Sequence, residues 1–187
     1  MVKNAILIHG TGGSPNSNWF QYIDDYLTSK GYEVFRPQLP NKDRPNIENQ
    51  VPFLLESSFE FNEETIIIAH SAGCPITIAL LEELETKVDK VILVGGYLRS
   101  LDIDITKPTL KKEEEYNWEK IRNSVNHFYI LNSDDDPFGC TIENQGKYMA
   151  EKLGGELISM IGEKHMCVID DPIKYRQLPI LKELVDR

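Results

Sequence analysis

The stretch that most constrains the fold of this chain is Thr65–Pro75, which reads TIIIAHSAGCP. Its three consecutive isoleucines, Ile66–Ile68, form a β-branched run that is too short for a helix and is typical of a strand buried on both faces of a parallel sheet. A helical pattern follows directly, because apolar residues recur every four positions from 76 to 84, and Pro75 is tolerated in a first helical turn. The sequence therefore predicts a buried strand that turns sharply into a helix at Ser71.

The rest of the chain repeats this alternation of strand and helix. Further strands are expected at 5–8, 32–36, 90–94, 128–131 and 156–161, and further helices at 19–30, 47–61, 141–153 and 180–187. Pro52 lies near the start of one helical pattern, so that helix is expected to kink or to begin later. The alternation predicts an α/β fold, a three-layer α/β/α sandwich around a mainly parallel sheet of about six strands. Because 187 residues contain no repeat or interdomain linker, we expect a single domain over 1–187.

The composition limits the classes of partner and the cell compartment that we expect for this protein. A net charge of −10 argues against nucleic acid or an anionic membrane as a partner, since phosphate binding needs a basic surface. No apolar run reaches the roughly 18 residues of a membrane span, and no signal peptide is expected. The three cysteines contain no close C-x-x-C pair, which argues against a disulfide framework or a zinc site. We therefore expect a cytoplasmic protein with free thiols.

The turn at Ser71 has the pattern of a nucleophile elbow. Ala69 and Gly73 stand two residues before and after the serine, close to the pattern G-x-S-x-G with alanine in place of the first glycine. Such a turn lifts the hydroxyl above the sheet, and the N–H groups at the start of the helix, including that of Ala72, can stabilise an oxyanion. The alternative is an ordinary strand-to-helix turn with the serine near the N-cap.

A second loop favours the same chemistry. The first strand ends in His9–Gly13, which lacks the spacing of a dinucleotide-binding or P-loop phosphate site. Instead, the backbone N–H of Thr11 or Gly12 is a candidate second donor to the oxyanion. The sequence does not choose between these two residues, and a flexible turn is the simpler alternative.

A serine hydroxyl needs a neighbouring imidazole to take its proton, and that imidazole needs a carboxylate. Among the four histidines, only His165 lies on a loop after the last predicted strand. His127 precedes a strand, His70 should point away from the hydroxyl, and His9 belongs to the glycine-rich loop. His165 is therefore the predicted base.

The candidate acids form one run, Asp134, Asp135 and Asp136, at the end of the preceding strand. The residues alone leave open which of the three is the acid. The run lacks the spacing of a calcium-binding loop, so no metal is expected. The chain order Ser, Asp, His is that of the α/β-hydrolases.

The segment 97–117 fits no regular pattern and carries an alternation of apolar and charged residues at 101–105. One interpretation is a small lid over the site, with Tyr97, Leu98, Tyr116 and Trp118 lining a substrate pocket. The other is a solvated connection that these side chains anchor.

With these candidates in place, the chain resembles the small serine hydrolases of the retinoblastoma-binding-protein-9 (YdeN-like) family, which are minimal α/β-hydrolases. The resemblance runs nearly end to end and is carried by His9-Gly10 with Trp19-Phe20, Ala69 to Pro75, Trp118 to Ile121, Ser133 to Pro137 and His165-Met166. It implies Ser71 as nucleophile, His165 as base and Asp136 as acid. Two departures are Glu163-Lys164, where the family often has a small residue, and Cys140, where it often has proline.

The resemblance implies a hydrolase of carboxylic esters or related acyl bonds that needs no cofactor and takes a small-molecule acyl substrate. Two alternatives stay open. The same triad could serve an acyltransferase or a peptidase-like activity, or the fold could be kept in a protein-binding module without catalysis.

Overall fold

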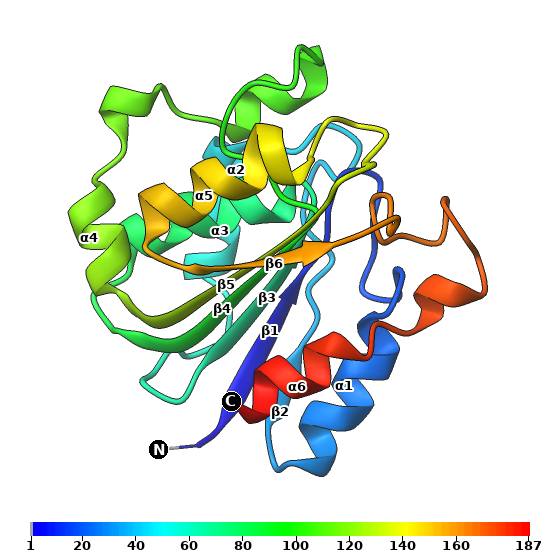
Figure 1. Ribbon diagram of the computed structural model, residues 1–187. Coiled ribbons are helices and arrows are strands. Elements are labelled where there is room, and N and C mark those ends of the chain that lie inside the picture. Colours follow the sequence, from blue (N-terminus) through cyan, green and yellow to red (C-terminus); the bar gives the residue numbers. More distant parts are fainter. Residues whose placement is uncertain (1) are drawn as a thin grey trace.

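The structure is a computed structural model that describes residues 2–187 (Figure 1). Its centre is a sheet of six strands in the order β2-β1-β3-β4-β5-β6, and every neighbouring pair is parallel. The strands are β1 (Asn4–Ile8), β2 (Glu33–Phe35), β3 (Ile66–His70), β4 (Val88–Val94), β5 (Val125–Ser133) and β6 (Glu156–Met160). The predicted sheet is thus confirmed, and β5 extends beyond its predicted ends.

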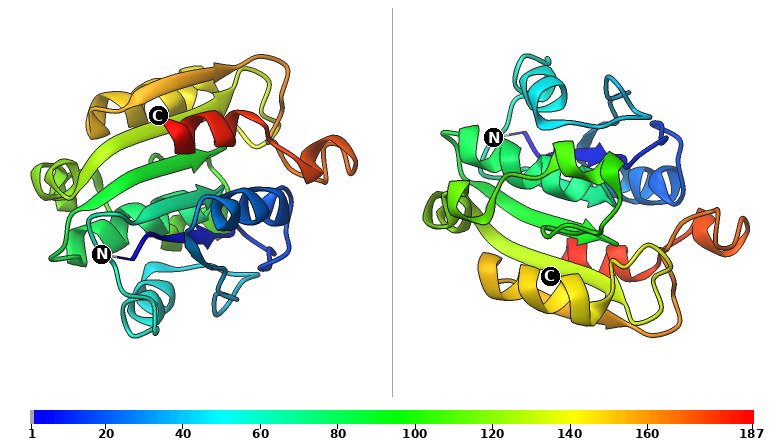
Figure 2. Two further views of the ribbon diagram at one scale, coloured as in Figure 1. Left: turned by 90° about the horizontal axis from the view of Figure 1, so that it is seen from below. Right: turned by 90° about the horizontal axis from the view of Figure 1, so that it is seen from above.

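Helices cover both faces of the sheet. They are α1 (Phe20–Ser29), α2 (Ile47–Leu55), α3 (Gly73–Glu83), α4 (Trp118–Asn123), α5 (Lys147–Leu153) and α6 (Ile180–Asp186). Figures 1 and 2 show α1 and α6 on one face and the other four helices on the opposite face. The arrangement is the predicted three-layer sandwich.

The strands build both halves of the core because successive side chains point to opposite faces. In β3, Ile67 and Ala69 pack with the apolar side chains of α2, α3, α4 and α5, whereas Ile66 and Ile68 pack with those of α1 and α6. All four residues are fully buried. The isoleucine run is therefore the strand with two buried faces that the sequence predicts.

The strand order determines where a ligand can bind. The chain passes from β1 outward to β2 and then returns to place β3 on the other side of β1. In open α/β sheets, this reversal leaves a crevice at the carboxyl ends of the two strands, and ligands bind there. Here the crevice lies between the glycine-rich loop after β1 and the turn at Ser71 after β3.

Several helices differ from their predicted bounds. Helix α2 begins at Ile47, where the Asn46 side chain accepts a hydrogen bond from the Asn49 N–H, and keeps Pro52 within it. It ends at Leu55 rather than near 61, because Phe59 leaves the helical path and stacks on Phe35 of β2.

The predicted helix 141–153 opens with a π-helical turn, Ile142–Gly146, before α5. The segment 97–117 holds two short 3-10 helices, η1 (Asp104–Thr109) and η2 (Glu113–Glu115). A third, η4 (Lys174–Arg176), precedes α6. Within residues 2–187, no helix has the length and apolar character needed to cross a membrane.

Candidate active site

Ser71 lies at the apex of the turn between β3 and α3. Its backbone is in the left-handed region, with φ of 54°, and its N–H donates to the Val94 carbonyl of β4. A Cβ added at Gly73 would lie 2.6 Å from the Ile8 carbonyl oxygen, so the start of α3 nearly touches β1. A Cβ at Gly10 would lie 2.7 Å from Ser71 Cβ, which brings the loop after β1 directly against the serine. Only glycine allows both approaches.

Asp136 and His165 form a buried pair at the ends of β5 and β6. The His165 Nδ1 lies 2.6 Å from Asp136 Oδ2, and the Asp136 and His165 side chains are 0% and 6% exposed. The second carboxylate oxygen of Asp136 accepts the Phe138 N–H at 2.8 Å. With Nδ1–H directed at the carboxylate, Nε2 of His165 is the ring nitrogen left to accept a proton. Ser71 and His165 line the same cavity.

The other two aspartates hold the loop that carries His165. Asp134 Oδ1 accepts the Gly162 N–H, and Asp135 Oδ1 accepts the Lys164 N–H, each at 2.8 Å. The Ser133 hydroxyl also donates to Asp135 and, with the Lys164 N–H, lowers the pKa of this carboxyl. Asp134 and Asp135 are exposed, and both support the loop rather than the imidazole ring of His165.

His70 supports the backbone of His165. Its Nε2 lies 3.0 Å from the His165 carbonyl oxygen, so Nε2 carries the proton and donates, and Nδ1 accepts from the Asn18 side-chain amide at 3.3 Å. The ring is buried, and burial lowers its pKa to about 3. His70 also lines the cavity, which the sequence did not predict, but both of its ring nitrogens are engaged.

His9 has a comparable structural role. The Leu39 N–H donates to its Nε2 at 3.1 Å, so its Nδ1–H is directed at the Gly10 carbonyl at 2.9 Å. Burial lowers the pKa of this ring as well. Its side chain thus fixes the start of the glycine-rich loop.

The two candidate donors of that loop differ in what their N–H groups contact. The Gly12 N–H donates to the Lys42 carbonyl at 2.8 Å. Within residues 2–187, no protein acceptor takes the N–H of Thr11 or that of Ala72. The geometry thus leaves the N–H groups of Thr11 and Ala72 free beside the serine.

The cavity that contains Ser71 has a volume of about 450 Å³, within the range of small-molecule sites. Tyr97 lines it, as the sequence predicts. Leu98 and Trp118 do not, so that part of the prediction is wrong. Leu98 points into the core between the sheet and its helices, and Trp118 packs on Tyr116, with ring centroids 4.6 Å apart. Both side chains anchor the segment, as in the second interpretation.

Most of the apolar side chains that line this cavity were not predicted from the sequence. These side chains come from the segment after β4, the turn after β5 and the loop after β6: Leu101, Ile103, Ile105, Phe138, Val168 and Ile169. The alternation at 101–105 was the available signal, because its apolar members, Leu101, Ile103 and Ile105, are the residues that line the cavity.

One group of side chains has the spacing of metal ligands. Atoms of Asp136, Cys140 and His165 lie within 4.8 Å of one another. Asp136 and His165 are hydrogen-bonded to each other, and burial raises the pKa of the Cys140 thiol well above its usual value. A cysteine binds a metal as its thiolate, and this thiol resists ionisation, so the group fits an Asp–His pair better than a metal site.

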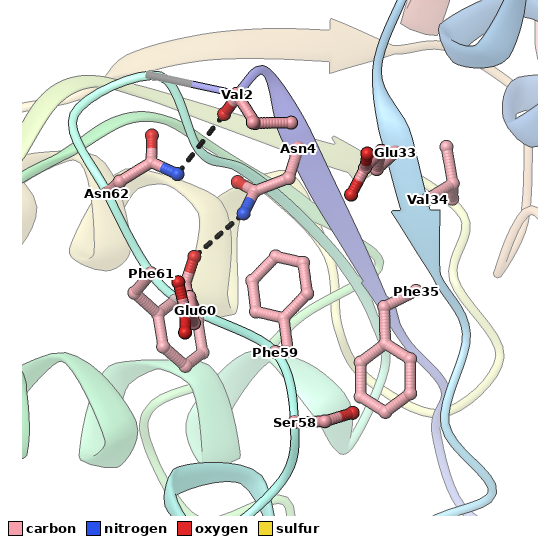
Figure 3. A pocket seen from close by; sticks show the side chains of 10 residues that line it. All are labelled: Val2, Asn4, Glu33, Val34, Phe35, Ser58, Phe59, Glu60, Phe61 and Asn62. Carbon is pink, nitrogen blue, oxygen red and sulfur yellow. Dashed lines mark hydrogen bonds between the residues drawn. The ribbon is translucent and has the colours of Figure 1, made fainter.

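A second cavity, of about 480 Å³, lies at the amino ends of β1 and β2 (Figure 3). Phe35, Phe59 and Phe61 line it together with Glu33 and Glu60. Among residues 2–187, no histidine lines this cavity beside its one hydroxyl residue, Ser58, and it lies at the opposite end of the strands from Ser71.

A parallel sheet with a serine at a tight strand-to-helix turn and a buried Asp–His pair at later strand ends defines the class of α/β-hydrolases. Within this class, the chain belongs to the family described as Serine hydrolase, which it matches over residues 5–187.

Two curated relatives agree with this assignment. The chain is 30% identical to Putative hydrolase YdeN of Bacillus subtilis over 143 residues, which cover 73% of this chain and 72% of the relative. It is 27% identical to Serine hydrolase RBBP9 of Rattus norvegicus over 165 residues, 86% of each chain. The protein is thus a small hydrolase of the YdeN and RBBP9 type, as the sequence motifs indicate.

The fold agrees as well. The crystal structure of the ydeN gene product from B. subtilis matches with a TM-score of 0.88 and 24% identity. The match covers 98% of this chain and 97% of that one.

Proposed function

We propose that this protein hydrolyses carboxylic esters, or closely related acyl bonds, through an acyl-enzyme on Ser71. The observation that carries the proposal is the buried Asp136–His165 pair, at 2.6 Å, in the same cavity as a serine with the strained backbone of a nucleophile elbow. Membership of the serine hydrolase family supports it.

The proposed reaction has two halves. His165 Nε2 takes the proton of the Ser71 hydroxyl as Oγ attacks the acyl carbonyl, and Asp136 stabilises the imidazolium that forms. His165 then gives this proton to the leaving alcohol as the carbon–oxygen bond breaks. In the second half, water attacks the acyl-enzyme with His165 again as base, and the acid and free Ser71 are released.

The oxyanion formed in each half needs two donors beside the serine. We assign them to the backbone N–H groups of Ala72 and Thr11, since the Gly12 N–H is engaged by the Lys42 carbonyl. Of the two loop residues left open by the sequence, Thr11 is therefore the better supported. No step in this mechanism requires a cofactor.

The proposal also covers the cell compartment in which the enzyme acts. All three cysteines are free and buried, as suits the reducing cytoplasm. We therefore propose a cytoplasmic enzyme.

The decisive experiment is intact mass spectrometry after exposure to a fluorophosphonate, followed by assays with 4-nitrophenyl esters. We expect one adduct on the native protein and none on Ser71→Ala. The matched control is Ser100→Ala, an exposed serine outside the cavity, which should be labelled like the native chain. A folded protein that forms no adduct would favour the non-catalytic binding module.

The assay with 4-nitrophenyl esters also shows whether water or another molecule accepts the acyl group. If an added alcohol or amine captures the acyl group faster than water does, the protein is an acyltransferase. We expect free acid to be the main product.

A further inference from the structure

The lining of the active-site cavity carries much less charge than the rest of the protein. Charged residues make up 27% of the chain, yet no Asp, Glu, Lys or Arg lines this cavity in residues 2–187. The polar side chains of its lining are hydroxyl, amide and imidazole groups, and the other side chains are aliphatic, aromatic or thiol groups. The polar ones belong to Thr11, Ser17, Asn18, His70, Ser71, Thr106 and His165. A charged group bound there would lose its hydration without gaining a partner of opposite charge.

Residues 103–107, in the segment after β4, carry charged side chains that do not line the cavity. Ile103 and Ile105 line the cavity, and each is 37% exposed. Between and after them, Asp104 and Lys107 pair with each other at 2.7 Å, and their side chains are 92% and 62% exposed. The segment thus directs its apolar side chains at the cavity and its charges at solvent.

The two ends of a bound ester can be assigned to two walls. The leaving alcohol must lie next to His165, which gives it a proton. Phe138 contacts the His165 ring edge-on, with centroids 4.8 Å apart. A second part of the lining lies beside Ala72, which packs in a small apolar cluster with Tyr97, Cys140 and Leu101. Because the Ala72 N–H is a proposed oxyanion donor, the acyl chain starts beside this cluster.

We propose that the site selects esters with an uncharged, apolar acyl group, seated against Tyr97, Leu101, Ile103 and Ile105, and that these residues set the preference for acyl chain length. This inference rests on the proposed function and names its substrate class. Each methylene buried against the wall adds to transition-state binding until the wall is covered.

The test measures kcat/KM for 4-nitrophenyl esters from acetate to octanoate. We expect a rise of about two- to fourfold per methylene over the first several carbons. The mono-4-nitrophenyl ester of adipate and the ester of 6-aminohexanoate should each react at least tenfold more slowly than the hexanoate ester. A flat series, or equal rates for the charged esters, would overturn the inference and leave the proposed function intact. Rejection of the anionic ester alone would also overturn it, because the net charge of the protein would explain that result.

Two matched variants test which residues of the cavity contact the acyl chain. Ile105→Asp should lower the ratio of octanoate to acetate activity at least tenfold. Ile173→Asp, on an 85% exposed isoleucine outside the cavity, should leave this ratio within twofold of the native value. If Ile169→Asp lowers the ratio and Ile105→Asp does not, the acyl chain lies on the His165 side and the assignment is wrong.

A binding measurement separates the two proposals. Calorimetry on Ser71→Ala compares 2-decanone with 2-butanone, which are neutral and cannot be hydrolysed. If no ester is hydrolysed but 2-decanone binds at least tenfold more tightly, the proposed function fails while the apolar site stands. If neither hydrolysis nor chain-dependent binding is found, both proposals fall.

Discussion

At the scale of single residues, the three adjacent aspartates show how one sequence motif divides its tasks. Asp136 turns into the protein to meet His165, while Asp134 and Asp135 turn out and accept backbone N–H groups of the loop that carries this histidine. The sequence shows three equivalent carboxylates, and only the direction of each side chain separates them.

We expect Asp136→Asn to lower kcat by about 10⁴-fold, because an amide in this place favours the wrong tautomer of His165. Asp134→Asn and Asp135→Asn should have much smaller effects, since the amide oxygen can still accept the backbone N–H of the loop and only the negative charge is lost. Ester hydrolysis by the three purified variants, with thermal melting as a check of folding, measures the difference. Equal losses in all three would mean that the acid is misassigned.

His70 is predicted to be a positioning residue. His70→Phe removes the donor to the buried His165 carbonyl, which costs about 1–3 kcal/mol of stability. It should also lower kcat more than it changes KM, because the loop of the base is less firmly held. His70→Gln can still donate a hydrogen bond and should restore part of kcat. The exposed His127 gives the control, His127→Phe.

The same histidine makes a prediction about pH. Its pKa is about 3 in the folded protein and about 6.5 when unfolded, so the unfolded chain binds the extra proton. Its contribution to stability is therefore full above pH 6.5 and is lost as the pH falls toward 3. Urea unfolding between pH 7 and pH 4 should show a shallower loss in His70→Phe than in the native protein. Parallel curves would show that His70 is not buried in its neutral form.

At the scale of elements, the contact between β1 and α3 decides whether the elbow can form. Gly73→Ala would press a methyl group against the Ile8 carbonyl, 2.6 Å away. We expect a loss of about 1–3 kcal/mol, as for overpacked cores, together with a large loss of activity. Glu83→Ala, at the exposed end of the same helix, should change stability by less than about 0.5 kcal/mol. Chemical denaturation of both variants tests this, and an unaffected Gly73→Ala would show that the two elements have room to separate.

The elements also show which features a sequence can reveal. The run Ile66–Ile68 and the glycines around Ser71 are local signals, and they predicted the sheet, the turn and the order of the site residues. The end of α2 at Leu55 depends on Phe59 meeting Phe35, and the positions of Leu98 and Trp118 depend on core packing. Such contacts join distant parts of the chain, so the periodicity of apolar residues within one segment cannot predict them.

At the scale of the whole molecule, the thiols are distributed through the interior. Cys74, Cys140 and Cys167 are all buried, and burial raises the pKa of each, that of Cys167 to about 11. We expect less than one thiol per chain to react with an aromatic disulfide reagent within minutes in the native protein, and three to react after unfolding in urea. Rapid native labelling would show that the loop around Cys167 opens readily.

The order of the strands also bears on how this protein is made. Ser71 and its oxyanion loop belong to the first 72 residues, whereas His165 follows β6, the last strand and an edge of the sheet. A chain emerging from the ribosome therefore carries its serine long before it carries the base. In the proposed mechanism, Ser71 therefore cannot be activated until the residues that follow β6 have been synthesised and have folded against it.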